Sequence, residues 1–246
     1  MERRSTSDAM VRWTFLGRTA YRPCWALQQR LCDGRRAGRI GDTLLLTEHD
    51  PVYTIGKSGN PLHLLAGEEE LRRRNIELVQ TDRGGDITYH GPGQLVGYPI
   101  LDLDGYGLDL HRYLRNLEDV VIRTLAEYGV EGGRVPGYTG VWVGGEKICA
   151  IGIRTCHRVT MHGFALNVTT DLRAFDRIIP CGIFERGVTS MEEVLRVRVP
   201  WEDVGRRLVG CFGEVFGCAV EEGGLRVCGE DAVVDGTGVS VEGTKR

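Results

Sequence analysis

The chain has 246 residues, of which 41% are hydrophobic and 26% charged, and its formal net charge is −3. This length and composition are typical of one large α/β domain, and the slightly negative charge provides no overall field that would attract nucleic acid. We expect no membrane-spanning segment, because no apolar run reaches the roughly 18 residues required, and no secretory signal, because no apolar stretch follows Arg3 and Arg4.

Apolar periodicity and terminator residues predict helices mixed with strands along the chain. We expect helices over residues 22–36, 68–74, 109–128 and 200–216, and strands over residues 43–47, 77–81, 95–101, 140–143, 147–153 and 164–168. Gly144 and Gly145 are predicted to form the turn of a hairpin. Since regular strand–helix–strand spacing is missing, we expect an α/β fold of the α+β type, a single domain with a mixed sheet flanked by helices.

The helix over residues 109–128 is the clearest of these elements. Its apolar residues fall on one stripe, namely Leu110, Tyr113, Leu114, Leu117, Val121 and Leu125. Asp109 is a suitable N-cap and Gly129 a suitable C-terminal residue, so both ends of the helix are predicted.

Residues 83–94 form the most distinctive stretch of the sequence, RGGDITYHGPGQ, with four glycines and one proline. Glycine allows positive φ and a close approach of a ligand to the backbone, at an entropic cost. Predicted strands precede and follow the stretch, so we expect a loop at the edge of a sheet that serves as a binding surface.

A candidate nucleophile lies further along the chain. None of the eight cysteines belongs to a CxxC motif, which speaks against zinc-finger and thioredoxin chemistry, and we expect most of them to be buried apolar residues. Cys181 differs because Pro180 and Gly182 flank it in a turn-like context. A nucleophilic thiol needs a base, and His90, His162 and Lys147 are the candidates.

We expect no catalytic role for the other four histidines, and the sequence gives little support for a metal site. His49, His63, His111 and His157 lie in contexts typical of surface or helix positions. A metal site built from His90, His162 and a cysteine is conceivable, but no short ligand spacing supports it.

Lysine is rare in this chain. Of the 31 basic residues only Lys57, Lys147 and Lys245 are lysines. Lysine can release its proton in a suitable environment, whereas arginine stays charged, so a retained lysine suggests proton transfer. Lys57 and Lys245 lie in turn-like and tail-like contexts, but Lys147 opens a predicted buried strand.

Several motifs together resemble the lipoyl(octanoyl) transferases, the lipoate–protein ligase B family. The blocks are Arg83-Gly84-Gly85-x-x-Thr88-Tyr89-His90-x-x-x-Gln94-x-x-x-Tyr98, Gly140-Val141-Trp142-Val143, Lys147-Ile148-Cys149-Ala150-Ile151-Gly152, His162-Gly163-Phe164-Ala165-Leu166-Asn167, and Pro180-Cys181-Gly182 followed by Gly187-Val188-Thr189-Ser190. The resemblance implies a fold similar to the catalytic domain of biotin and lipoate ligases. It places this domain at residues 11–222, and we expect residues 1–10 and 230–246 to be flexible termini.

The resemblance also implies an activity and its residues. Such enzymes move an octanoyl group from acyl carrier protein to a lysine ε-amino group of a lipoyl carrier domain. Cys181 matches the nucleophile that carries the acyl group as a thioester, and Lys147 matches the residue that acts as acid and base. The substrate-binding stretches correspond to Arg83, Gly84, Gly85, Asp86, Ile87, Thr88, Tyr89 and His90, to Ala150, Ile151 and Gly152, and to Gly163, Phe164 and Ala165.

Cofactor and partner expectations follow from this chemistry. A thioester donor is already activated, so we expect no ATP and no metal, and the chain has no GxxxxGK[ST] motif. The implied partners are octanoyl-loaded acyl carrier protein, the lipoyl domains of 2-oxoacid dehydrogenases and the glycine cleavage H protein, with no nucleic acid or membrane. We expect a monomer in the cytoplasm, with the mitochondrial matrix as the alternative location. Residues 72–74, three arginines, are a candidate basic patch for the carrier protein or a solvated helix face.

Two other functions remain open on the sequence. An ATP-dependent lipoate or biotin ligase of the same fold would form an acyl-adenylate and would not need the Cys181 thiol. A non-catalytic module that binds acyl carrier protein would need neither Cys181 nor Lys147.

Overall fold

The computed structural model describes residues 9–179, 186–225, 232–235 and 238–241. Its helices are α1 (Tyr21–Arg36), α2 (Glu68–Arg73), α3 (Leu103–Tyr106), α4 (Leu110–Ala126), α5 (Met191–Leu195) and α6 (Trp201–Phe216), with the 3-10 helices η2 (Pro61–His63) and η3 (Leu172–Arg177). Its strands are β1 (Met10–Thr19), β2 (Asp42–His49), β3 (Val52–Ile55), β4 (Glu77–Gln80), β5 (Ile87–His90), β6 (Gln94–Ile100), β7 (Gly133–Val135), β8 (Tyr138–Val143), β9 (Glu146–Cys156), β10 (Val159–Asn167), β11 (Ala219–Glu222), β12 (Ala232–Asp235) and β13 (Gly238–Val241).

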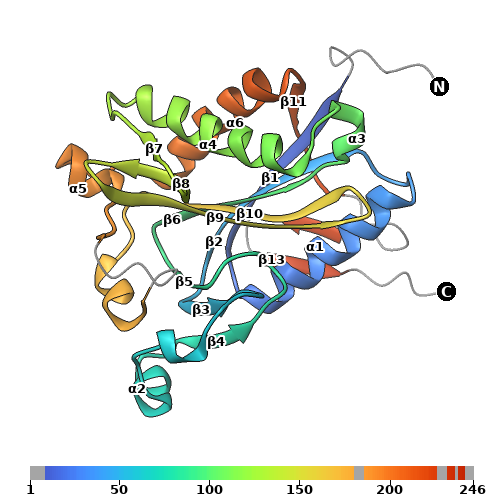
Figure 1. Ribbon diagram of the computed structural model, residues 1–246. Helices are drawn as coiled ribbons and strands as arrows, with labels where there is room; N and C mark the ends of the chain where they lie inside the picture. Colours follow the sequence, from blue (N-terminus) through green and yellow to red (C-terminus); the bar gives the residue numbers. More distant parts are fainter. Residues whose placement is uncertain (1–8, 180–185, 226–231, 236–237, 242–246) are drawn as a thin grey trace.

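An eight-stranded mixed sheet forms the centre of the molecule, in the order β11-β1-β2-β6-β10-β9-β8-β7. β1 runs parallel to β2 and β11, and the other neighbours pair antiparallel. Helices α4 and α6 cover one face and α1 lies against the other (Figure 1). The predicted fold class, a mixed sheet flanked by helices, is therefore confirmed.

Each face of the sheet has its own apolar core. The larger core joins the sheet to α4 and α6 through residues such as Leu44, Leu117 and Phe212. The smaller one packs Leu27 and Leu31 of α1, four residues apart on the helix, against the opposite face. Alternation along the strands assigns successive side chains to the two cores.

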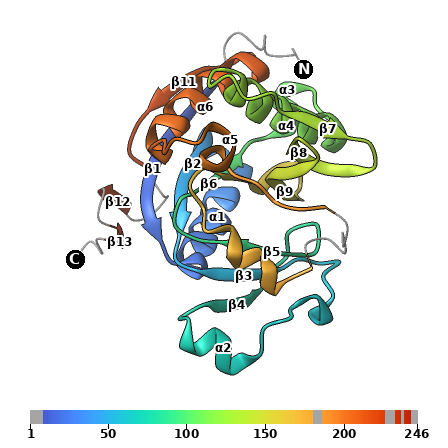
Figure 2. The same ribbon diagram turned by 90° about the vertical axis from the view of Figure 1, so that its left-hand side faces the viewer.

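A second sheet of three strands, in the order β4-β3-β5, lies on the α1 side of the large sheet (Figure 2). β3 runs parallel to β4 and antiparallel to β5. A separate apolar cluster that includes Tyr53, Tyr89 and Phe175 packs on this small sheet. The arrangement leaves β5 facing the large sheet, where the candidate site is found.

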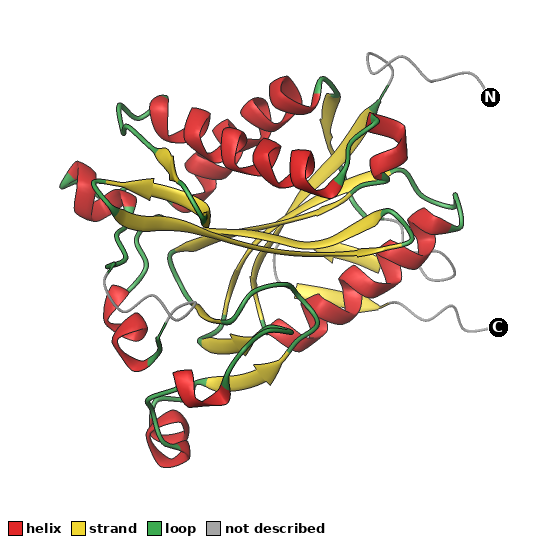
Figure 3. Cartoon of the chain, in the orientation of Figure 1, coloured by secondary structure: helices red, strands yellow, loops and turns green. Residues whose placement is uncertain are grey.

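The predicted helices and strands lie close to the observed ones, with three corrections (Figure 3). The glycine-rich stretch over residues 83–94 is not a loop throughout, because β5 lies inside it and pairs with β3. Other elements that were not predicted are β1, β3, β7, β11, α3 and α5. β1 and β3 are defined by pairing with partners distant in the sequence. Residues 230–246 were predicted to form a flexible terminus, but within them β12 and β13 pair antiparallel. No helix in the described ranges is long and apolar enough to cross a membrane.

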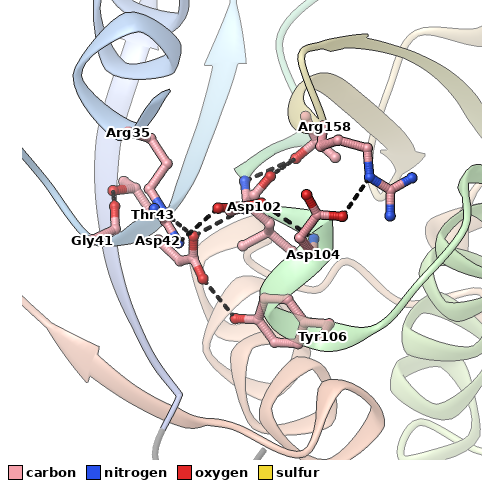
Figure 4. A network of polar contacts seen from close by, with 10 residues as sticks. Arg35, Gly41, Asp42, Thr43, Asp102, Asp104, Tyr106 and Arg158 are labelled. Carbon is pink, nitrogen blue, oxygen red and sulfur yellow. Dashed lines mark hydrogen bonds and ion pairs between the residues drawn. The ribbon is translucent and has the colours of Figure 1, made fainter. Parts of the chain in front are cut away.

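Asp42 organises a polar network where β2 begins (Figure 4). Its carboxylate accepts hydrogen bonds from Arg35 Nε at 2.6 Å, the Asp102 amide at 3.1 Å and the Tyr106 hydroxyl at 3.0 Å. Nearby, Arg158 pairs with Asp104 on α3 at 2.7 Å. The contacts connect the end of α1, the start of β2 and helix α3.

Candidate active site

A cavity of about 450 Å³ lies between the large sheet and the small one. Its walls come from β5 and β6, from β9 and β10, and from the glycine-rich segment that precedes β5. A volume of this size falls within the range of small-molecule binding sites, about 300–1,000 Å³. The described structure therefore contains room for a small ligand beside the most distinctive stretch of the sequence.

Most of the residues expected at the site line this cavity. They are Arg83, Gly84, Gly85, Asp86, Ile87, Thr88, His90, Lys147, Ala150, Ile151, Gly152, Gly163, Phe164 and Ala165. Tyr89 does not, because its ring belongs to the apolar cluster on the small sheet. There it packs against Tyr53 and Phe175, with ring centroids 5.4 and 5.7 Å apart.

The cavity exists because small residues of β9 and β10 form part of its wall on the side of the large sheet. Ala150 and Gly152 on β9 pair with Ala165 and Gly163 on β10, so two alanines and two glycines meet in one patch. Larger side chains at Ala150, Gly152 or Ala165 would fill the space. A Cβ added at Gly152 would already lie 2.8 Å from the Gly84 carbonyl oxygen.

Arg83 fixes the glycine-rich segment from within. Its guanidinium is buried and donates to the Thr54 carbonyl at 2.6 Å and to the Gly84 carbonyl at 3.1 Å. The Gly84 amide in turn donates to the Ile153 carbonyl on β9 at 2.9 Å. Gly85 has φ +88°, a left-handed conformation that favours glycine. The segment is thus tied to both sheets, and Arg83 supports the cavity wall.

Lys147 reaches the cavity through an irregularity in the sheet. Val141 on β8 pairs with Cys149, but the next residue, Trp142, pairs with Lys147, so Ile148 is an extra residue on β9. Regular alternation would place Lys147 on the same face as Cys149, towards α4. The extra residue reverses the alternation, so Ile148 and Cys149 both enter the α4 core and Lys147 joins the cavity wall.

Lys147 is held by contact with an aromatic ring and by backbone hydrogen bonds. Its side chain is buried, with Nζ 4.8 Å from the centroid of the Trp142 ring. Its backbone amide donates to the Gly187 carbonyl at 3.0 Å, and its carbonyl accepts from the Thr189 amide at 3.0 Å. Val188, between them, also lines the cavity.

Cys181 lies outside the described residues, but the chain on both sides of it is well anchored. Before it, the Ile179 amide donates to the His63 carbonyl at 2.8 Å. After it, Gly187 and Thr189 bond to the backbone of Lys147. The segment that contains Cys181 therefore begins beside η2 and ends beside Lys147.

Two of the candidate bases are neutral histidines held by other side chains. Burial, together with the neighbouring His49, holds the pKa of His90 well below its ordinary value, and its Nδ1 lies 2.8 Å from Gln94 Oε1. Burial, and then the charge of Arg83, lowers the pKa of His162 to about 3. His162 Nε2 lies 2.6 Å from Asp82, whose charge Arg154 balances. Among the described residues no group of three or more His, Cys, Asp or Glu side chains is placed to hold a metal ion.

The interpretation of His49 as a surface or helix residue is wrong. It ends β2 with no exposed area, and burial lowers its pKa to about 4. Its Nδ1 lies 3.0 Å from the Thr19 carbonyl, so Nδ1 carries the proton and Nε2 accepts from the Tyr98 hydroxyl at 2.7 Å. The position is not visible in the local sequence, because neighbouring strands create the burial.

Several cavity residues were missed as site residues. Tyr21, Leu114, Tyr138 and Phe175 line the cavity from distant segments and carry no local signal. Gln94, Tyr98 and Asn167 also line it, and they stood in the motifs quoted above, which could have identified them.

The candidate basic patch over residues 72–74 is partly neutralised on its own helix. Arg72 lies 3.2 Å from Glu68 and Arg74 lies 2.9 Å from Glu70. The pairs are of the i,i+4 type and largely exposed, which favours a solvated helix face.

Comparison with known proteins gives consistent similarities. The family described as "Lipoyl protein ligase A/B catalytic domain" matches residues 20–213. The chain is 57% identical over 203 residues to an octanoyltransferase of Rubrobacter xylanophilus, covering 82% of this chain and 91% of that protein. It is 51% identical over 205 residues to an octanoyltransferase of Chloroflexus aurantiacus, covering 82% and 92%. A crystal structure of lipoate-protein ligase A bound with ATP shares the fold, with a TM-score of 0.72, 19% identity and coverage of 89% and 90%.

Proposed function

The chain belongs to the lipoyl protein ligase A/B catalytic domain family and is an acyltransferase related to its octanoyltransferases, and from this we propose that it transfers octanoyl groups from acyl carrier protein to lysines of lipoyl domains. The observation that carries the proposal is the position of Lys147, buried in the wall of a largely apolar cavity. Its backbone pairs with residues 187–189, which follow Cys181 in the chain. The acceptors include the lipoyl domains of 2-oxoacid dehydrogenases and the glycine cleavage H protein.

In the first step Cys181 attacks the thioester of the donor. Lys147 takes the thiol proton, the new C–S bond forms, the carrier C–S bond breaks, and Lys147 returns the proton to the departing carrier thiolate. One thioester is exchanged for another, so the acyl group stays activated without ATP.

In the second step the ε-amino group of the acceptor lysine attacks the Cys181 thioester. A C–N bond forms, the C–S bond to Cys181 breaks, and Lys147 carries the proton from the amine towards the Cys181 thiolate. The product is an amide, which is more stable than a thioester and makes the overall transfer favourable. The apolar lining contributed by residues such as Val96 and Phe164 suits the hydrocarbon chain of the substrate.

Substitution of Lys147→Arg tests the proposal. Arginine keeps the charge but cannot cycle a proton at neutral pH, so we expect a folded protein with transfer reduced by at least 100-fold. Intact mass after mixing with octanoyl-loaded carrier protein should show one octanoyl group on the wild type and none on Cys181→Ala. Lys57→Arg is the matched control, because Lys57 is exposed and should be replaceable.

Two results would contradict the proposal. Wild-type turnover in Lys147→Arg would exclude this residue as the acid and base. Labelling of the acceptor from free octanoate and ATP, with Cys181→Ala fully active, would instead indicate an ATP-dependent ligase.

A further inference from the structure

Helix α4 carries a carboxylate that is completely buried. Glu118 has no exposed area, and three donors converge on it. Oε2 accepts from Arg115 Nη1 and Arg134 Nε, both at 2.7 Å, and Oε1 accepts from the Gly140 amide at 3.1 Å. Taking a carboxylate out of water is unfavourable unless such partners compensate it, so a helix that needed only packing would use an apolar residue here.

The Gly140 contact leads directly to Lys147. Gly140 has φ +118°, and a Cβ added there would lie 2.5 Å from the Cys149 carbonyl oxygen and 3.7 Å from Lys147 Cε. The bare backbone of β8 thus lies against the side chain of Lys147. Gly140 also immediately precedes Val141, the residue at which the pairing of β8 with β9 shifts.

We propose that Glu118 is a positioning residue for Lys147, acting through Gly140. By accepting the Gly140 amide it holds β8 in the shifted pairing, and the shifted pairing is what turns Lys147 from the α4 core to the cavity. Without the carboxylate, the Gly140 amide is free to pair with β9. The shifted pairing that directs the Lys147 side chain into the cavity is then no longer favoured. The inference rests on the proposed role of Lys147 in acyl transfer.

The test compares Glu118→Gln with Asp119→Asn. The glutamine side chain has one acceptor oxygen for three donors, so either Gly140 or the arginines lose their partner. Asp119 is the matched control: it lies on the same helix and accepts from the same Arg134 at 2.5 Å, whereas the Gly140 amide donates to Glu118. Steady-state kinetics with octanoyl-loaded carrier protein are measured for each variant well below its Tm.

A positioning role predicts a split between kinetic constants. Glu118→Gln should lower kcat by about 10- to 100-fold, since misplacing a catalytic group by about 1 Å has effects of that size. KM for the donor should stay within about twofold, because the cavity lining is retained. Asp119→Asn should keep the wild-type kcat.

A lower Tm for Glu118→Gln with kcat within twofold of wild type would overturn the inference, because Glu118 would then only stabilise the fold. Equal losses of kcat in the two variants would overturn it as well. If Glu118→Gln does not fold, amide exchange of Gly140 in the wild type decides: slow exchange supports the contact, and exchange at the rate of an open chain refutes it.

Failure of the inference is separable from failure of the proposed function. If Lys147→Arg keeps wild-type turnover, the function assigned to Lys147 is wrong. If Lys147→Arg is inactive while Glu118→Gln keeps the wild-type kcat, only the positioning role is wrong.

Discussion

Lowering the pH from 7 to 5 should reduce the free energy of unfolding by about 2 kcal/mol through His49 alone. Burial holds the pKa of this histidine at about 4, partly opposed by its hydrogen bond with the Thr19 carbonyl and by Asp50. In the unfolded chain the pKa is about 6.5. Below that pH the unfolded chain binds a proton that the folded protein does not, so stability is lost as the pH falls from about 6.5 towards 4.

The size of the effect follows from the difference in pKa. Each pKa unit corresponds to about 1.4 kcal/mol, so the difference of about 2.5 units gives a full loss of about 3.5 kcal/mol, of which slightly more than half has occurred by pH 5. The structure explains the direction, because protonating Nε2 would place a donor against the Tyr98 hydroxyl, which donates to it. His90 and His162, also buried, add losses of the same sign.

Urea unfolding of the wild type and of His49→Gln at pH 7 and pH 5 isolates this contribution. Glutamine does not titrate, whereas the other ionisable groups are common to both proteins. The wild type should lose about 2 kcal/mol more than the variant over this interval. Equal losses in the two proteins, or a wild type that becomes more stable in acid, would refute the assignment of a buried, neutral His49.

Two further changes have expected outcomes. Asp42→Ala removes the carboxylate that accepts from Arg35 and Tyr106, although Arg35 keeps its contact with Asp102 at 3.5 Å. We expect the free energy of unfolding in urea titrations to fall by about 2–3 kcal/mol, and a loss below about 1 kcal/mol would show that the network is not stabilising. Ala165→Leu should fill part of the cavity. The ratio of kcat/KM for octanoyl and hexanoyl carrier protein should then change by about fourfold per methylene displaced, in favour of the shorter chain. An unchanged ratio would contradict the assignment of Ala165 to the wall that holds the acyl chain.

Much of the fold could be predicted because local patterns carried it. α4 has one apolar stripe, the N-cap Asp109 accepts from the Arg112 amide at 2.7 Å, and the helix ends close to Gly129 as expected. β1 and β3 could not be predicted in the same way, because their strands are defined by pairing with distant segments.

The residues of the candidate site likewise fall into those that local motifs predict and those that depend on the folded chain. Short motifs gave the residues of β5, β9 and β10 that line the cavity. The direction of the Lys147 side chain could not be predicted from its motif. Regular alternation would place it on the face towards α4, and only the extra residue Ile148 places it on the cavity side. Glu118 was invisible for a similar reason: a glutamate on a helix is ordinarily a surface residue, and its three donors come together only in the folded chain.

The small residues in the cavity wall limit how the ligand specificity of this site can change by mutation. Ala150, Gly152 and Ala165 belong to the two smallest residue types, so almost every substitution at these three positions removes volume from the cavity. Only a change from alanine to glycine adds any, and it adds a single methyl group. At Gly163 the neighbouring strand leaves no room for a side chain, because a Cβ there would lie 2.1 Å from the Gly97 carbonyl oxygen. Single substitutions in this wall can therefore readily shift the preference towards shorter ligands, but hardly at all towards longer ones. A longer substrate would require movement of the strands or changes on the opposite wall.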